Sequence, residues 1–102
     1  MDAVVTITQD GRLRHVLAVR FVGPETETWS AAFLLASRLV SQGLFSPRDV
    51  SFRNAEGAKR DGRMGPGGEP RLLLDAGSDL GAALDLKRRV EDLVPRVLSE
   101  DT

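Results

Sequence analysis

The sequence has no cysteine among its 102 residues. This absence excludes disulfides, thiol catalysis and cysteine-based metal sites, and it fits a reducing cytoplasm, where we expect the protein to reside. There is also only one histidine, His15. A zinc site normally draws on several cysteine or histidine ligands, so we expect neither a metal nor a cofactor in this protein.

Long apolar runs and a dominant charge are missing as well. No apolar stretch approaches the roughly 18 residues of a membrane span, and the N-terminal MDAVVTITQD lacks the basic start of a signal peptide. Lys and Arg total 14 against 15 Asp and Glu, so the net charge is −1. This balance does not steer the molecule toward nucleic acid or membranes. The length predicts a single domain, residues 1–102, with a core of its own.

The most apolar helical pattern, in residues 26–42, is central to the expected fold. Thr26 is a suitable N-cap because its hydroxyl can accept a backbone N–H of the first turn. Gly43 is placed to end the helix in a left-handed conformation. At 100° per residue, one broad apolar arc collects the side chains of Trp29, Ala32, Phe33, Leu35, Ala36, Leu39 and Val40. The arc is wider than the roughly 100° stripe that one sheet requires, which predicts contact with a second helix as well.

Two strands are expected before this helix, at 3–8 and 13–22, joined by a turn around Gly11. A three-residue loop collects the apolar side chains of both strands on one face, whereas a two-residue turn mixes threonines into that face. We therefore predict that Thr8 pairs with Arg12 and that Gly11 has a positive φ in a G1 bulge.

The second half of the chain repeats the order of strand, strand and helix. Residues 49–53 and 71–76 form the expected strands, and the Gly-rich segment 54–70, NAEGAKRDGRMGPGGEP, is expected to be a flexible loop between them. Ser78 or Asp79 should cap the last helix. The apolar stripe of that helix consists of Ala83, Leu86, Val90, Leu93 and Val97.

These elements predict an α+β domain built from two strand–strand–helix units. We expect a four-stranded, mainly antiparallel sheet with both helices packed on one face. The predicted core comprises Leu17, Val19, Phe33, Ala36, Val40, Leu73 or Leu74, Leu86, Val90 and Leu93.

No group of residues forms a convincing catalytic constellation. His15 would need a positioned partner and a nucleophile to act as a base, and the sequence shows neither. The glycines of 62–68 lack the helix that follows a phosphate-binding loop. Trp29 lies inside the apolar arc, which favours a core position over ligand stacking. A small-molecule pocket, as the alternative hypothesis, would lie between sheet and helices, near His15 or Trp29.

Basic side chains gather in or beside the Gly-rich loop, namely Arg53, Lys59, Arg60, Arg63 and Arg71. Acidic residues of the same segment offset them, and the loop has no aromatic residue on which a base could stack. Nucleic-acid binding through this loop is therefore a secondary hypothesis.

The leading hypothesis is a non-enzymatic interaction or regulatory module that forms a homodimer. Alternation along the second strand places some apolar residues opposite the core face, and the triple leucine 72–74 is apolar on both faces. A contiguous apolar patch in water usually marks an interface. We predict that this patch comprises Val16, Ala18, Val22, Leu72 and Leu74. The alternatives are a heteromeric partner on the same patch, and a ligand-binding or enzymatic pocket.

Overall fold

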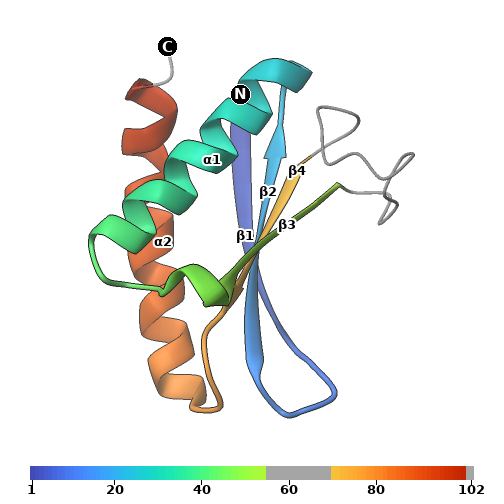
Figure 1. The fold of residues 1–102 in the computed structure, drawn as a ribbon, viewed down its shortest axis with the longest axis vertical. Coiled ribbons are helices and arrows are strands. Elements are labelled where there is room, and N and C mark those ends of the chain that lie inside the picture. The colour runs from blue at the N-terminus through green and yellow to red at the C-terminus, as the bar shows by residue number, and fades with distance from the viewer. Residues whose placement is uncertain (55–69, 101–102) are drawn as a thin grey trace.

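The computed structural model describes residues 1–54 and 70–100 of the chain. Its elements are β1 (Asp2–Gln9), β2 (His15–Val22), α1 (Glu25–Ser41), the 3₁₀ helix η1 (Pro47–Asp49), β3 (Val50–Asn54), β4 (Pro70–Asp75) and α2 (Leu80–Glu100). The strands form one antiparallel sheet in the order β1-β2-β4-β3. Both helices lie on the same side of this sheet (Figure 1), so the predicted α+β fold is confirmed.

Residues 55–69, which make up nearly all of the loop predicted to be flexible, lie outside the described residues. Within 1–54 and 70–100, no helix combines the length and the apolar character needed to cross a bilayer.

The core lies between the helices and one face of the sheet. Along β2, Leu17, Val19 and Phe21 are fully buried, whereas the alternate residues face the other side. β4 presents Leu72 and Leu74 to the same core. Because burying a side chain of this size stabilises the fold by about 1.5–3 kcal/mol, these two strands supply much of the stability of the sheet.

The β1–β2 hairpin differs in register from the predicted one. Thr8 pairs with Val16 and not with Arg12. The reason is a longer loop, which the Asp10 carboxylate closes by accepting the backbone N–H groups of Arg12 and Arg14 at 2.8 and 3.0 Å. From position 12 to position 16 the shift is four residues, an even number, so the predicted apolar face of both strands is preserved.

Leu13, and not Gly11, takes the left-handed conformation in this loop, with a φ of 61°. The Leu13 backbone N–H donates to Asp10 O at 3.1 Å, which closes the turn. The Leu13 side chain is 67 % exposed, so packing does not compensate for the strain. A non-glycine residue in this region costs about 1–2 kcal/mol.

α1 begins at Glu25, so Pro24 is its N-cap and the prediction of Thr26 is wrong. The Pro24 carbonyl accepts the backbone N–H of Thr28 at 2.9 Å, which closes the first helical turn ahead of Thr26. Pro24 has a φ of −58° and an extended ψ of 136°, the conformation of a residue that precedes a helix.

The end of α1 follows the prediction. Gly43 has a φ of 75°, and its backbone N–H donates to Val40 O. The next N–H, of Leu44, reaches back to Leu39 O at 3.0 Å. These two bonds form a Schellman motif, which satisfies carbonyl groups that the helix end leaves unpaired.

α2 also follows the predicted pattern. Asp79 is its cap, because Asp79 Oδ1 accepts the backbone N–H of Gly81 at 3.1 Å. The apolar stripe packs into the core, with Ala83, Val90 and Val97 at 1 % exposure or less.

Most of the predicted core is buried. Val40 and Leu86 are half-buried, and Phe33 is exposed. The buried members are Leu17, Val19, Ala36, Leu74, Val90 and Leu93.

We predict that Leu13→Gly raises the melting temperature, because glycine adopts a positive φ without the steric penalty. A net gain of up to about 1 kcal/mol corresponds to roughly 4–8 °C for a domain of this size. Arg12→Gly is the control in the same loop, without a positive φ, and should leave melting unchanged or lower it. A lower melting temperature for Leu13→Gly would contradict the strain at this position.

We also predict that Val90→Asp prevents folding or costs several kcal/mol, because it places a charge without a partner in the core. Circular dichroism during urea titration measures the change. Arg88→Asp, at an exposed position of the same helix, should retain a normal unfolding curve. Unchanged unfolding of Val90→Asp would place this side of α2 outside the core.

Candidate interaction site

The two helices do not cover the sheet evenly. α1 packs over β2 and β4, α2 packs over β1 and β2, and the helices also contact each other. The inward side chains of β3, Val50 and Phe52, are only half-buried. Beside them lies an apolar groove of about 520 Å³, which we call the α1–β3 groove. Its lining residues are Phe33, Ala36, Ser37, Val40, Ser41, Pro47, Val50 and Phe52.

Phe33 is the exposed aromatic residue of this groove. Its ring lies between those of Trp29 and Phe52, with centroid distances of 5.7 and 4.8 Å, yet 54 % of the residue is exposed. The prediction that Phe33 belongs to the core is therefore wrong. Phe33 lies at the edge of the apolar arc that faces β3, and α2 packs on the other side of α1.

The 3₁₀ helix η1 fixes one wall of the groove. Ser46 and Asp49 form a capping box, in which Ser46 Oγ and the Ser46 backbone N–H both donate to Asp49 Oδ2, at 2.7 and 3.3 Å. This turn places Pro47 at the groove and leads directly into β3. None of the described residues in the lining is ionisable, so the groove is suited to binding apolar groups rather than to acid–base chemistry.

The opposite side of the sheet, which we call the open face, carries part of the predicted patch. Val16 and Ala18 are half-buried there, and Val22 is 41 % exposed. Val4 of β1 adds a further residue at 51 % exposure. The open face is therefore partly apolar, as the alternation of β2 predicts.

The leucines of β4 are placed differently from the prediction. Leu72 and Leu74 are fully buried beneath the helices, so their assignment to an exposed interaction patch is wrong. The physical reason is the register of β4, which sets Leu73 opposite Ala18 on the open face and turns its two neighbours inward.

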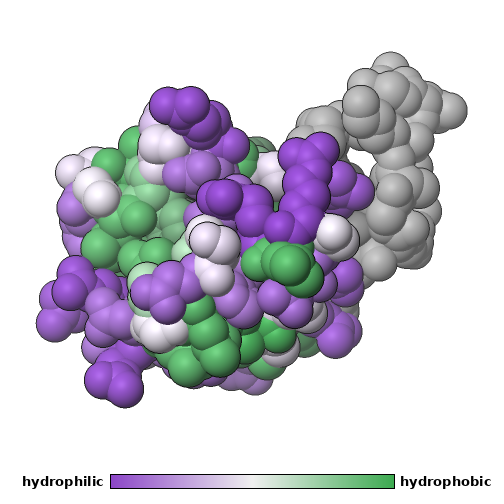
Figure 2. All heavy atoms as spheres, turned by 90° about the horizontal axis from the view of Figure 1, so that it is seen from below, coloured by the Kyte–Doolittle hydropathy of each residue, from purple (hydrophilic) through white to green (hydrophobic). Residues whose placement is uncertain are grey.

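Other exposed apolar residues lie in the β1–β2 loop and at the start of α2, where Leu80 and Leu84 are one helical turn apart. Leu13, Leu80 and Leu84 are 67, 52 and 47 % exposed. Figure 2 shows, on the side seen from below, that hydrophilic side chains divide the apolar surface into separate areas. Single exposed apolar residues are normal on a protein surface. The α1–β3 groove differs because its apolar side chains line one continuous hollow.

Of the predicted basic contacts, Arg53 and Arg71 lie on the open face, directly opposite each other on β3 and β4. Lys59, Arg60 and Arg63 lie outside the described residues.

The structure does not bring His15 and Trp29 together. His15 begins β2, whereas Trp29 belongs to α1, which follows the other end of that strand. The His15 backbone donates to Gly77 O at 2.7 Å and accepts from the Ala76 N–H at 2.8 Å. Trp29 is 5 % exposed, and its buried Nε1 finds no acceptor among the described residues. Because neither residue lines the groove, the structure gives no support for a shared pocket.

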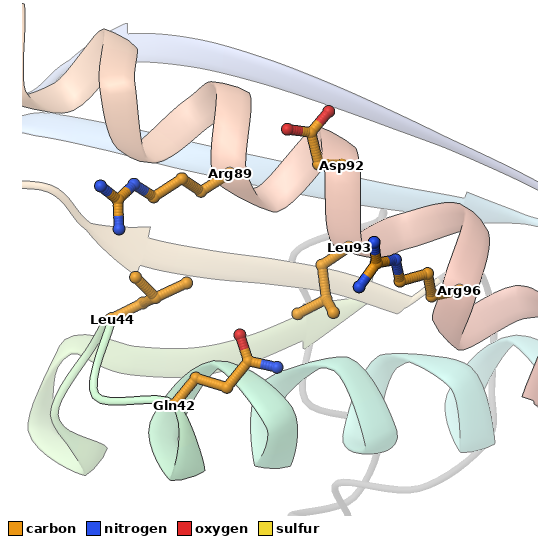
Figure 3. Close-up of a pocket in the computed structure, with 6 residues that line it drawn as sticks. All are labelled: Gln42, Leu44, Arg89, Asp92, Leu93 and Arg96. Atoms are coloured by element: carbon orange, nitrogen blue, oxygen red, sulfur yellow. The ribbon is translucent and has the colours of Figure 1, made fainter.

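A second hollow, of about 350 Å³, lies between the end of α1 and α2 (Figure 3). In this view the Gln42 side chain points toward α2, whereas the Asp92 carboxylate points away from α1. Arg89 pairs with Asp85 at 3.2 Å, and both side chains are more than half exposed. The complete lining is Gln42, Leu44, Arg89, Asp92, Leu93 and Arg96. These side chains include no hydroxyl or thiol nucleophile, and the four polar ones are exposed, as is typical of a solvated surface.

An ion pair connects the β1–β2 loop to the end of β4. Arg14 Nε lies 3.0 and 2.9 Å from the two carboxylate oxygens of Asp75, and the Gly77 backbone N–H donates to Asp75 Oδ1 at 3.0 Å. The hydrogen bond from Arg14, followed by that from Gly77, holds the pKa of Asp75 below its ordinary value. The same pair raises the pKa of Arg14.

The chain matches no protein-family model, no curated protein and no solved structure. Among the described residues, no three His, Asp or Glu side chains come close enough to hold a metal ion. Support for a function therefore comes from the surfaces themselves, and the α1–β3 groove is the more apolar of the two hollows.

We predict that Asp75→Asn lowers stability at neutral pH and that the difference narrows in acid. The pKa of Asp75 is lower in the folded chain, so its carboxylate contributes stability above the unfolded value of about 3.9. This contribution is lost as the pH falls through the folded pKa. Both side chains of the pair are more than a third exposed, so the effect should be small. Denaturant titrations of both proteins, from neutral pH down into acid, measure the difference in the free energy of unfolding. A difference that does not change with pH would contradict an ionic cause.

Proposed function

We propose that this chain is a non-enzymatic interaction module that forms a homodimer through β3 and the α1–β3 groove. One observation carries the proposal: Phe33 is 54 % exposed beside the half-buried Phe52, next to a strand at the edge of the sheet. Aromatic residues are enriched at protein interfaces. Contiguous apolar surface in water normally marks a binding surface.

The edge strand gives two copies a direct way to meet. Within the described residues β3 pairs only with β4, so backbone groups on its outer side are available to a further antiparallel strand. Identical chains most often meet around a two-fold axis. An axis perpendicular to the sheet would pair β3 with β3 and keep all helices on one side, so the two α1–β3 grooves would face each other.

The residues of β3 are compatible with this pairing. With Phe52 at the axis, Ser51 of one copy lies opposite Arg53 of the other copy. Like charges directly opposite each other would destabilise the pairing, and this register avoids placing the two copies of Arg53 opposite each other. The other edge strand, β1, has α2 over its inner side. These features favour β3 over β1 as the contact.

A dimer through the open face, as the sequence predicts, has less support. Leu72 and Leu74 are buried and do not contribute to that surface. Arg53 and Arg71 add charge to it, whereas the core of an interface is normally depleted of charged residues. The groove has no such charge in its described lining. The alternative is a different protein that binds in the same groove. The oligomeric state of the purified chain distinguishes this alternative from a homodimer.

We predict that light scattering at micromolar concentration gives the mass of a dimer and that Phe33→Ser gives a monomer. Truncating an aromatic residue at the centre of an interface commonly costs 2 kcal/mol or more, which corresponds to roughly 30-fold in dissociation constant. Because Phe33 is more than half exposed, the variant should fold, which its melting curve verifies.

Two further variants serve as controls. Leu84→Ser removes an apolar side chain of similar exposure, 47 %, from α2, and should leave the dimer intact. Val16→Arg adds a charge to the open face and should also leave it intact. A monomeric wild type would contradict the homodimer. Dissociation by Val16→Arg but not by Phe33→Ser would place the contact on the open face instead.

A further inference from the structure

The open face carries a row of three arginines. Arg20 of β2 pairs with Arg71 of β4, and Arg71 pairs with Arg53 of β3. All three lie at positions that alternate with the buried residues of their strands. Because neighbouring strands are about 4.8 Å apart, the Cα atoms of the three arginines span about 10 Å. The row therefore crosses three adjacent strands, at right angles to the chain direction.

Within the described residues, Arg53 and Arg71 of this row place like charges directly opposite each other. Like charges directly opposite each other destabilise a sheet. Arg53 and Arg71 have no carboxylate partner within ion-pair distance among the described residues. A ligand with several negative charges would relieve this repulsion, and guanidinium groups bind phosphate oxygens in a bidentate manner. The charge of Arg53 and Arg71 thus indicates an anionic ligand.

The surroundings of the row narrow the class of ligand. The adjacent row across the sheet contains Thr6, Ala18, Leu73 and Ser51, which offer aliphatic surface and hydroxyl groups. The backbone groups of this face are used within the sheet, so a peptide cannot pair with them here. The major groove of a duplex admits a helix or a two-stranded ribbon, and a sheet of four strands is neither. An extended single strand, with phosphates on the arginines and bases on the adjacent row, fits the surface.

We propose that the open face binds single-stranded nucleic acid, with Arg20, Arg71 and Arg53 as the phosphate-binding row. This site lies on the sheet and differs from the loop site predicted from the sequence. It is also separate from the α1–β3 groove, which lies on the opposite side of β3. The inference therefore does not depend on the homodimer.

The proposal makes a quantitative prediction about salt. Three phosphate contacts on a single strand give a slope of about −2 for the logarithm of the association constant against the logarithm of salt concentration. Removing two contacts reduces the slope to about −0.7. For proteins that bind equally at 1 M salt, this difference in slope makes the association constant of the wild type about 25-fold higher than that of the variant at 0.1 M salt.

Fluorescence anisotropy with a labelled oligothymidine of about 12 nucleotides tests it. The double variant R53Q/R71Q should bind about 25-fold more weakly at 0.1 M salt. R88Q is the control, because Arg88 is exposed on α2, away from the open face. The double variant should melt at or above the wild-type temperature at low salt, because repulsion in the row is relieved; this verifies that it folds.

Three results would overturn the proposal. The first is no binding of the oligothymidine by the wild type at low salt. The second is an equal loss of affinity in R88Q, which would indicate attraction without a defined site. The third is competition by polyglutamate as effective as that by unlabelled oligothymidine, which would assign the row to an acidic protein segment.

Discussion

Leu17 and Val19 of β2 lie opposite Leu74 and Leu72 of β4 in the middle of the sheet, and all four side chains are fully buried beneath the helices. Each contributes about 1.5–3 kcal/mol by its burial. Both helices pack on this centre, α1 from the β4 side and α2 from the β1 side. β3 pairs with β4 but lies beyond the main cover of the helices. Its partial exposure follows from where the apolar residues of the sheet are concentrated.

This uneven cover gives β3 two different surfaces. On the inner side, Phe52 and the exposed ring of Phe33 form an apolar groove suited to a protein contact. On the open face, Arg53 belongs to a row of arginines suited to phosphate groups. A strand of five residues thus takes part in both proposed interactions. Neither interaction needs the buried core to change, because both use side chains that the folded monomer leaves exposed or half-buried.

Local patterns in the sequence are sufficient to predict the elements and the inward residues of β2. They do not predict the hairpin register, because Asp10 closes a longer loop through backbone hydrogen bonds that alternation does not reveal. The position of Phe33 depends on where β3 and α2 lie relative to α1. The arginine row depends on the pairing of β2 with β4, which lie far apart in the chain, so the sequence groups Arg53 with Arg71 but does not place Arg20 beside them.

The central claim is that β3 is an uncovered strand that pairs with β3 of a second copy. Amide hydrogen exchange, followed by NMR at low and high protein concentration, tests this most directly. We predict that protection of the β3 amides increases with protein concentration, while protection of the amides of β1, the other edge strand, stays the same. Exchange of β3 that does not change with concentration, or a gain in protection confined to β2, would contradict it.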